Sequence, residues 1–364
     1  MLIDMYPMSS ATLPSPSAAR PSLVTDTGGF AGQRRAAFPK VRPPGYFSPD
    51  ADPAAVQAFY AANGYLVLEG GFTPAEVEEL KRETTLICRG DRGELPDHPK
   101  AAATEPDDSV LQRFLCIHFP HKCSDVMLRT VHSAPTVKTL TTIIGPNVKC
   151  MQSMLFIKSS GKPGQAWHQD EDYIPTRDRS LVGAWIALDR ATQENGCLWV
   201  MPGSHRPGIL WEQQWHGDRR FDCAEESINF PFTDDQAIPV EVEAGSVVFF
   251  NGYLLHRALP NRAPAGTYRR SLVNHFMSCE SLMPWGKTPE GEHNAHYDYR
   301  DIIIVAGQDP YAYKGYTNIQ TPSVRPSGQG GCDKWGGAGR KYQDEAPAKP
   351  GSVLKTAPVA GGPM

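Results

Sequence analysis

The stretch AWHQDEDYIP, residues 166–175, carries the spacing on which the interpretation of this chain depends. His168 and Asp170 stand two positions apart within it. In a β-strand, side chains at i and i+2 point to the same face, so this pair can bind one metal ion side by side. A further histidine, His256, follows in FFNGYLLHRALPN, residues 249–261. Two histidines and one carboxylate form the facial set that holds non-haem Fe(II) and leaves coordination positions open.

The third ligand and a nearby arginine come from a separate part of the chain. His256 lies just beyond SVVFF, residues 246–250, an apolar run that predicts a buried strand. Arg269 follows it. Because a planar guanidinium matches a carboxylate in bidentate fashion, Arg269 is a candidate to hold a carboxylate cosubstrate beside the metal. The arrangement favours an oxygenase.

The amino-acid sequence around these residues is similar to that of a known family. The segments that carry the resemblance are HQDEDYIP (168–175), GAWIALDRATQENGCLWVMPGSHRPG (183–208), GSVVFFNGYLLHRALPNR (245–262) and RRSLVNHF (269–276). Together they resemble the phytanoyl-CoA dioxygenase family of Fe(II)/2-oxoglutarate-dependent oxygenases. The resemblance extends over roughly residues 50–280.

The resemblance implies roles for individual residues. It assigns iron to His168, Asp170 and His256, and the anchoring of 2-oxoglutarate to Arg269. It also implies three further residues at the 2-oxoglutarate site: Met154, Gln169 and Trp185. For the tryptophan and the methionine, plain core packing is the alternative. The cofactors implied are Fe(II), with 2-oxoglutarate and O2 as cosubstrates and ascorbate as a stimulant.

Two features depart from the family pattern. The arginine comes later after the distal histidine than in the family's usual spacing, and Pro264, Ala265 and Gly266 indicate a lengthened turn. Arg269 and Arg270 are therefore rivals for the same role, and they would point to opposite faces of the following strand. Ala258 stands where the family can use a small hydroxyl residue, so one 2-oxoglutarate contact is missing or replaced.

The resulting functional hypothesis is an Fe(II)- and 2-oxoglutarate-dependent dioxygenase that hydroxylates a small organic substrate and releases succinate and CO2. Two alternatives remain open at this point. One is a non-oxidative metalloenzyme, an isomerase or lyase, on the same barrel. The other is a non-catalytic binding protein with a degenerate site.

The composition and net charge of the chain limit the kinds of partner that we expect it to bind. The 364 residues carry a formal net charge of -4, which gives no electrostatic footprint for nucleic acid. No apolar run approaches the roughly 18–20 residues that span a bilayer. The eight cysteines include no CxxC pair, so we expect reduced thiols and a cytoplasmic protein. The small-molecule substrate is the expected partner, and the sequence does not set the oligomeric state.

The predicted fold is an all-β core with flanking helices, a double-stranded β-helix or jelly roll of the cupin type. We expect a disordered segment at 1–45, the folded domain at 46–320 and a Gly- and Pro-rich tail at 321–364. Strands are predicted at 148–158, 181–188, 197–201, 238–242, 246–250 and 269–277. Asn195-Gly196 is typical of a hairpin turn, and residues 208–236 form an insertion that either covers the substrate or is a surface excursion.

Three helices are expected before these strands. Asp52-Pro53 predicts a capped helix that ends at Asn63-Gly64. The run from Thr73 to Glu76 is typical of a capping box at the start of a second helix, and a third helix is predicted from about residue 135 to 144.

Overall fold

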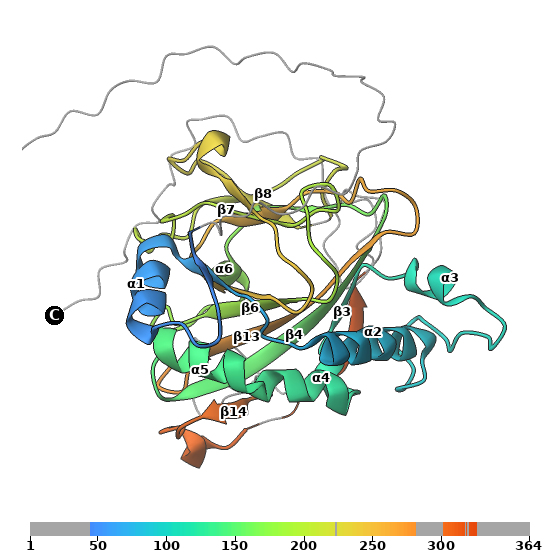
Figure 1. The fold of residues 1–364 in the computed structure, drawn as a ribbon, viewed down its shortest axis with the longest axis horizontal. Helices are drawn as coiled ribbons and strands as arrows, with labels where there is room; N and C mark the ends of the chain where they lie inside the picture. The colour runs from blue at the N-terminus through green and yellow to red at the C-terminus, as the bar shows by residue number, and fades with distance from the viewer. Residues whose placement is uncertain (1–43, 223, 282–300, 317, 319, 326–364) are drawn as a thin grey trace, which may run out of the picture. The chain divides into compact units, whose positions relative to one another are not determined.

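The computed structural model describes residues 44–222, 224–281, 301–316, 318 and 320–325 (Figure 1). These residues belong to one compact unit, Pro43–Met364. The predicted N-terminal segment 1–45 lies almost entirely outside the described residues. The boundary expected at residue 320 is corrected by strand β15, Ser323–Arg325, which joins the sheet by pairing with β3, Cys116–His118.

Local capping signals place the first two helices. Helix α1, Pro53–Asn63, begins after Asp52, whose carboxylate accepts hydrogen bonds from the backbone N–H groups of Ala54 and Ala55. It ends at Gly64, which has a φ of 78°. Helix α2, Pro74–Arg89, begins with the predicted capping box between Thr73 and Glu76. Both predictions are confirmed.

The predicted third helix is α5, Ala134–Ile143. The remaining helices are short: α3, Asp107–Leu111; α4, Asp125–Arg129; and α6, Asp170–Tyr173. Single 3-10 turns occur at Pro120–Lys122, Thr130–His132, Asp234–Gln236 and Ala312–Lys314.

The larger sheet has the order β1-β2-β11-β6-β13-β4-β3-β15, and β14 also pairs with β4. Its strands not yet delimited are β1, Tyr46–Phe47; β2, Tyr65–Leu68; β4, Val148–Ser159; β6, Val182–Ala187; β11, Val247–Asn251; β13, Tyr268–Ser278; and β14, Ile303–Ala306. The long antiparallel pair β4 and β13 forms its centre. The predicted strands at 148–158, 181–188, 246–250 and 269–277 all lie in this sheet.

The smaller sheet has the order β10-β7-β12-β5. These strands are β5, Gln165–His168; β7, Leu198–Val200; β10, Ile238–Val240; and β12, His256–Ala258. Asn195-Gly196 forms a turn, but the expected hairpin is wrong, because the turn leads from β6 in the larger sheet to β7, which pairs with β10 and β12. The predicted insertion contains a hairpin of β8, Gln213–Trp215, and β9, Glu225–Ser227.

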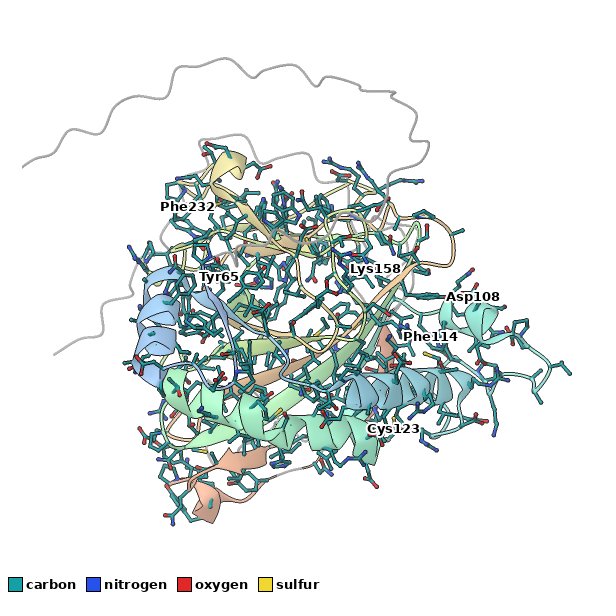
Figure 2. The ribbon with its side chains drawn as sticks, viewed as in Figure 1. Tyr65, Asp108, Phe114, Cys123, Lys158 and Phe232 are labelled. Carbon is teal, nitrogen blue, oxygen red and sulfur yellow. The ribbon has the colours of Figure 1, made fainter. Side chains whose placement is uncertain are left out.

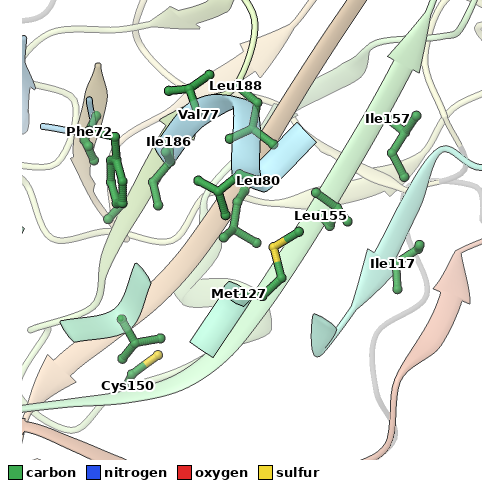
Figure 3. Close-up of a cluster of buried hydrophobic side chains, with 14 of the residues drawn as sticks. Phe72, Val77, Leu80, Ile117, Met127, Cys150, Leu155, Ile157, Ile186 and Leu188 are labelled. Atoms are coloured by element: carbon green, nitrogen blue, oxygen red, sulfur yellow. The ribbon is translucent and has the colours of Figure 1, made fainter. Parts of the chain in front are cut away.

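Two apolar clusters hold the layers together. The first lies between the helices and the outer face of the larger sheet, where Val77 and Leu80 of α2 pack with Leu155 and Ile186 (Figure 3). The second lies between the two sheets and joins residues such as Val248 and Val273 of the larger sheet to Val200 and Val240 of the smaller one. Two facing sheets with helices outside confirm the predicted jelly roll.

Candidate active site

His168 and His256 meet between the two sheets. They are opposite each other on the paired strands β5 and β12, and their ring centroids are 4.1 Å apart. Each ring is fixed by its own backbone, since Nδ1 of His168 lies 2.8 Å from the carbonyl oxygen of Ala166 and Nδ1 of His256 lies 3.0 Å from that of Leu254. A carbonyl can only accept, so Nδ1 carries a proton in both rings, and in the neutral tautomer Nε2 is the nitrogen with a free lone pair.

Asp170 reaches this pair from a helical turn. The predicted strand does not continue through it, because β5 ends at His168 and Asp170 begins α6. Its Oδ1 nevertheless lies 3.6 Å from Nε2 of His168 and 3.7 Å from Nε2 of His256. The three ligand atoms all lie within 4.8 Å of one another. The i, i+2 reasoning was therefore wrong about the backbone, while the two side chains still converge.

His275 completes the arrangement and was not singled out from the sequence. Its Nε2 lies 3.0 Å from Oδ2 of Asp170, and its side chain is buried. This contact leaves Oδ1 of Asp170 facing the two imidazoles. Alternation along β13 from Arg269 places residue 275 on the same face, and that signal could have identified it.

The protonation states suit a divalent metal ion. Burial lowers the pKa of His168 to about 3, and the neighbouring His256 acts in the same direction. Burial alone would raise the pKa of Asp170, but His256 and His275 outweigh it and hold that pKa well below its usual range. Neutral imidazole nitrogens and an ionised carboxylate are the forms that bind metal, and the donor set fits Fe(II).

A cavity opens beside these residues, with about 620 Å³ of empty space that includes its mouth to solvent. His168, Asp170, His256 and His275 line it. Its apolar wall includes four larger side chains: Met154, Phe156, Trp185 and Phe250. Met154 and Trp185, which the family resemblance implied at this site, thus face the same space as His168, Asp170 and His256, the candidate metal-binding triad.

Arg269 enters the cavity as a buried cation. Its side chain is 2% exposed, and its guanidinium carbon lies 5.4 Å from the centroid of the Trp185 ring. One terminal nitrogen donates to Oγ of Ser271 at 2.9 Å, whereas Nε has no hydrogen-bond partner. Within the described ranges, no ion pair joins Arg269 to an acidic side chain. Burial lowers its pKa to about 10, so the guanidinium stays charged at neutral pH.

The rival arginine points the other way. Arg270 forms a bidentate ion pair with Asp189, with both N–O distances at 2.8 Å, and it does not line the cavity. The opposite faces expected for the two neighbours are observed, and Arg269 is the one that shares the cavity with the candidate metal-binding triad.

Gln169 takes a different position from the one that the resemblance implied. Its amide nitrogen donates to the carbonyl oxygens of Ile209 and Tyr253, at 2.9 and 2.7 Å. Its amide oxygen accepts from the backbone N–H of Trp211 at 2.8 Å. The side chain is not part of the cavity wall. This placement corrects the expected cosubstrate contact, because Gln169 instead ties the 208–236 insertion to the turn before β12.

The insertion itself reaches the cavity through Asp222. Backbone hydrogen bonds join Gly164 to Arg220 and to Asp222, so this part of the insertion runs beside the start of β5. Asp222 lines the cavity and forms an ion pair with Arg325 of β15, with 3.2 Å between the charged atoms. At this point the insertion is part of the wall rather than a surface excursion.

Among the described residues, no helix is long and apolar enough to cross a membrane.

Comparison with known proteins gives consistent results. The family model described as phytanoyl-CoA dioxygenase (PhyH) matches residues 60–271. Phytanoyl-CoA dioxygenase 1 of Oryza sativa subsp. japonica is 28% identical over 260 residues, covering 63% of this chain and 90% of the relative. The peroxisomal phytanoyl-CoA dioxygenase of Bos taurus is 26% identical over 274 residues, covering 71% and 77%. The solved structure of a non-heme monooxygenase, ThoJ in its apo form, superposes with a TM-score of 0.54 at 19% identity, covering 74% and 87%, which supports the fold.

Proposed function

The chain belongs to the phytanoyl-CoA dioxygenase family, and from this premise we propose that His168, Asp170 and His256 hold its Fe(II) while Arg269 anchors 2-oxoglutarate. Membership makes the chain an iron- and 2-oxoglutarate-dependent dioxygenase. The proposal concerns which residues perform that activity and on what kind of molecule.

The observation that carries the proposal is a buried positive charge next to a facial triad. Arg269 has no acidic partner in the described part of the chain, and its Nε is unsatisfied. An isolated buried charge is costly, so the cavity is suited to an anionic ligand. A dicarboxylate whose keto-acid end reaches the triad and whose far carboxylate meets the guanidinium satisfies both requirements.

In the proposed reaction, Fe(II), 2-oxoglutarate and O2 together supply the oxidation that converts R–H to R–OH while 2-oxoglutarate becomes succinate and CO2. The protein binds and orients the reactants. Arg269 fixes the far carboxylate, and His275 keeps Oδ1 of Asp170 turned towards the imidazoles. The apolar wall with Met154, Phe156 and Trp185 excludes water from the reacting end.

The proposed substrate is a small organic molecule with an unactivated C–H bond. The cavity beside the triad must accommodate this molecule together with 2-oxoglutarate. The arginine beside the triad supports an oxidative reaction over a non-oxidative isomerase or lyase, because a non-oxidative reaction leaves no role for a 2-oxoglutarate anchor.

The proposed compartment is the cytoplasm. Six of the described cysteines are free thiols, and a reducing compartment keeps thiols in that state. The bovine relative's name places that protein in the peroxisome. Imaging of the tagged chain in its native cell distinguishes the two locations, and a punctate peroxisomal signal would contradict the cytoplasmic assignment.

Succinate formation tests the proposed function. Protein purified without oxygen is supplied with Fe(II), 2-oxoglutarate and ascorbate and then exposed to O2, beside His168→Ala and Arg269→Ala variants. We expect slow succinate release without primary substrate, abolished in both variants. Fe(II) bound without any binding of 2-oxoglutarate would favour the isomerase or lyase, and binding of neither would favour a degenerate binding protein.

A further inference from the structure

A second basic side chain stands beside Arg269 in the cavity wall. Lys158 lies near the C-terminal end of β4 (Figure 2), and the register of β4 with β13 places it directly opposite Arg269. Side chains directly opposite on neighbouring strands lie on the same face, with Cβ atoms about 4.5–5.5 Å apart. Both residues line the cavity, and each is only 2% exposed.

Lys158 has hydrogen-bonding capacity left over. Its Nζ donates to the carbonyl oxygen of Leu259 at 2.7 Å. An ammonium group carries three N–H donors, so a protonated Lys158 retains two more. Asp222 lines the same cavity, but its ion pair is with Arg325. No ion pair joins Lys158 to an acidic side chain in the part of the chain that the structure describes.

Two neighbouring buried cations are unfavourable without an anion between them. Burial lowers the pKa of Lys158 well below its usual value, and the charge of Arg269 lowers it further, whereas Asp222 opposes the shift. In the free protein, burial and the charge of Arg269 therefore both favour the neutral form of Lys158. A bound carboxylate would offset the repulsion between Lys158 and Arg269 and would therefore favour the ammonium form of Lys158.

We propose that Lys158 is a cosubstrate-binding residue that holds the distal carboxylate of 2-oxoglutarate together with Arg269. The inference rests on the proposed function. A carboxylate has about four lone-pair positions, of which the guanidinium occupies two, and the ammonium group of Lys158 takes another. Ala258, which also lines this cavity, offers no side-chain hydroxyl for the same carboxylate, so the lysine supplies a contact that Ala258 lacks.

The alternative role of Lys158 is structural, because its bond to Leu259 fixes the loop after β12. Lys158→Gln separates the roles: the amide can still donate to that carbonyl, but the positive charge is lost. Lys162→Gln is the matched control, because Lys162 is four residues away and does not line the cavity. The ligands are 2-oxoglutarate and 2-oxopentanoate, which has the same keto-acid end and a methyl group in place of the distal carboxylate.

The experiment measures the dissociation constants of both keto acids by anaerobic titration of the Fe(II)-loaded protein. Charge-assisted hydrogen bonds contribute about 1.5–3 kcal/mol, which corresponds to about a tenfold to hundredfold change in affinity. We expect Lys158→Gln to weaken 2-oxoglutarate binding by that factor, to leave 2-oxopentanoate binding almost unchanged, and Lys162→Gln to change neither. Equal weakening of both ligands would show a structural role and overturn the inference, as would unchanged binding of both.

Calorimetry of the wild-type protein gives a second test that does not depend on the variant folding. Titration with 2-oxoglutarate in two buffers of different ionisation enthalpy reports the protons taken up. We expect greater proton uptake with 2-oxoglutarate than with 2-oxopentanoate, because only 2-oxoglutarate brings a distal carboxylate to Lys158. Equal proton uptake with the two keto acids would overturn the proposed role of Lys158 but would leave the proposed function of the protein standing. Failure of the wild-type protein to bind either keto acid would instead overturn the proposed function, and the inference with it.

Discussion

Nε2 of His275 lies 3.0 Å from Oδ2 of Asp170, so a histidine of the larger sheet orients a carboxylate that stands just beyond the smaller sheet. His275 is on β13, the strand that also carries Arg269. One strand thus positions both the carboxylate of the triad and the cation proposed to hold the cosubstrate.

Replacing His275 should weaken metal binding without removing a ligand. Loss of a partner that orients a metal ligand typically costs 10-fold to 100-fold in affinity, and we expect an effect of this size for His275→Leu. His275→Gln can still donate to Asp170 and should recover part of the loss. Anaerobic Fe(II) titration of both variants measures this. An unchanged Fe(II) affinity in His275→Leu would contradict the positioning role.

Replacing Arg269 should weaken 2-oxoglutarate binding, whereas replacing its neighbour Arg270 should lower the stability of the fold. Arg269→Met should raise the KM for 2-oxoglutarate by about a hundredfold or more, because a charge-assisted bidentate contact is lost. Arg270→Met breaks the half-buried pair with Asp189, and we expect about 1 kcal/mol less stability with little change in KM. Steady-state kinetics and urea denaturation of the two variants measure both effects. A larger KM effect at position 270 would reverse the assignment.

Local signals predicted the helices because their causes lie within a few residues. The cap of α1 at Asp52 and the box that starts α2 at Thr73 depend on side chains next to the backbone groups that they satisfy. Short strands such as β3 and β15 exist through pairing with distant segments. No periodicity within three residues can indicate them, and the sequence analysis missed both.

The same difference between local signals and long-range pairing applies to the residues of the candidate site. Residue type and spacing predicted one site for His168, Asp170 and His256, and their ligand atoms do lie within 4.8 Å of one another, although the helical turn at Asp170 was not anticipated. Lys158 becomes visible only once the register of β4 and β13 is known, whereas alternation from Arg269 along the predicted strand could have identified His275. Gln169 lies between His168 and Asp170 in the sequence, yet its side-chain amide does not line the cavity. Closeness in sequence therefore did not predict its position.

Gln169 should contribute to stability rather than to cosubstrate affinity. Gln169→Ala removes three hydrogen bonds to backbone groups and leaves some of those groups buried without partners, at a cost of about 1–3 kcal/mol. Urea denaturation measures the loss, and 2-oxoglutarate titration of the folded variant should give a dissociation constant within about twofold of the wild type. Selective loss of 2-oxoglutarate binding with unchanged stability would restore the cofactor role.

Gly64 should tolerate substitution less well than another glycine of similar conformation. Gly64 and Gly161 have φ values of 78° and 82°, so alanine is strained at both, by about 1 kcal/mol. A Cβ at Gly64 would lie 2.4 Å from Nδ1 of His205. A Cβ at Gly161 would have no described heavy atom within 4 Å apart from its own residue and the two adjacent residues. We expect Gly64→Ala to cost about 1–3 kcal/mol more than Gly161→Ala. Equal losses in thermal denaturation would show that the 205 side chain moves aside freely.

The most direct test of the proposed site is the stoichiometry of Fe(II) binding under anaerobic conditions, in the wild type and in His168→Ala, Asp170→Ala and His256→Ala. The geometry of the triad predicts one Fe(II) per wild-type chain and a large loss of occupancy in each variant. Full occupancy that survives in all three variants would place the iron elsewhere and contradict the proposed site.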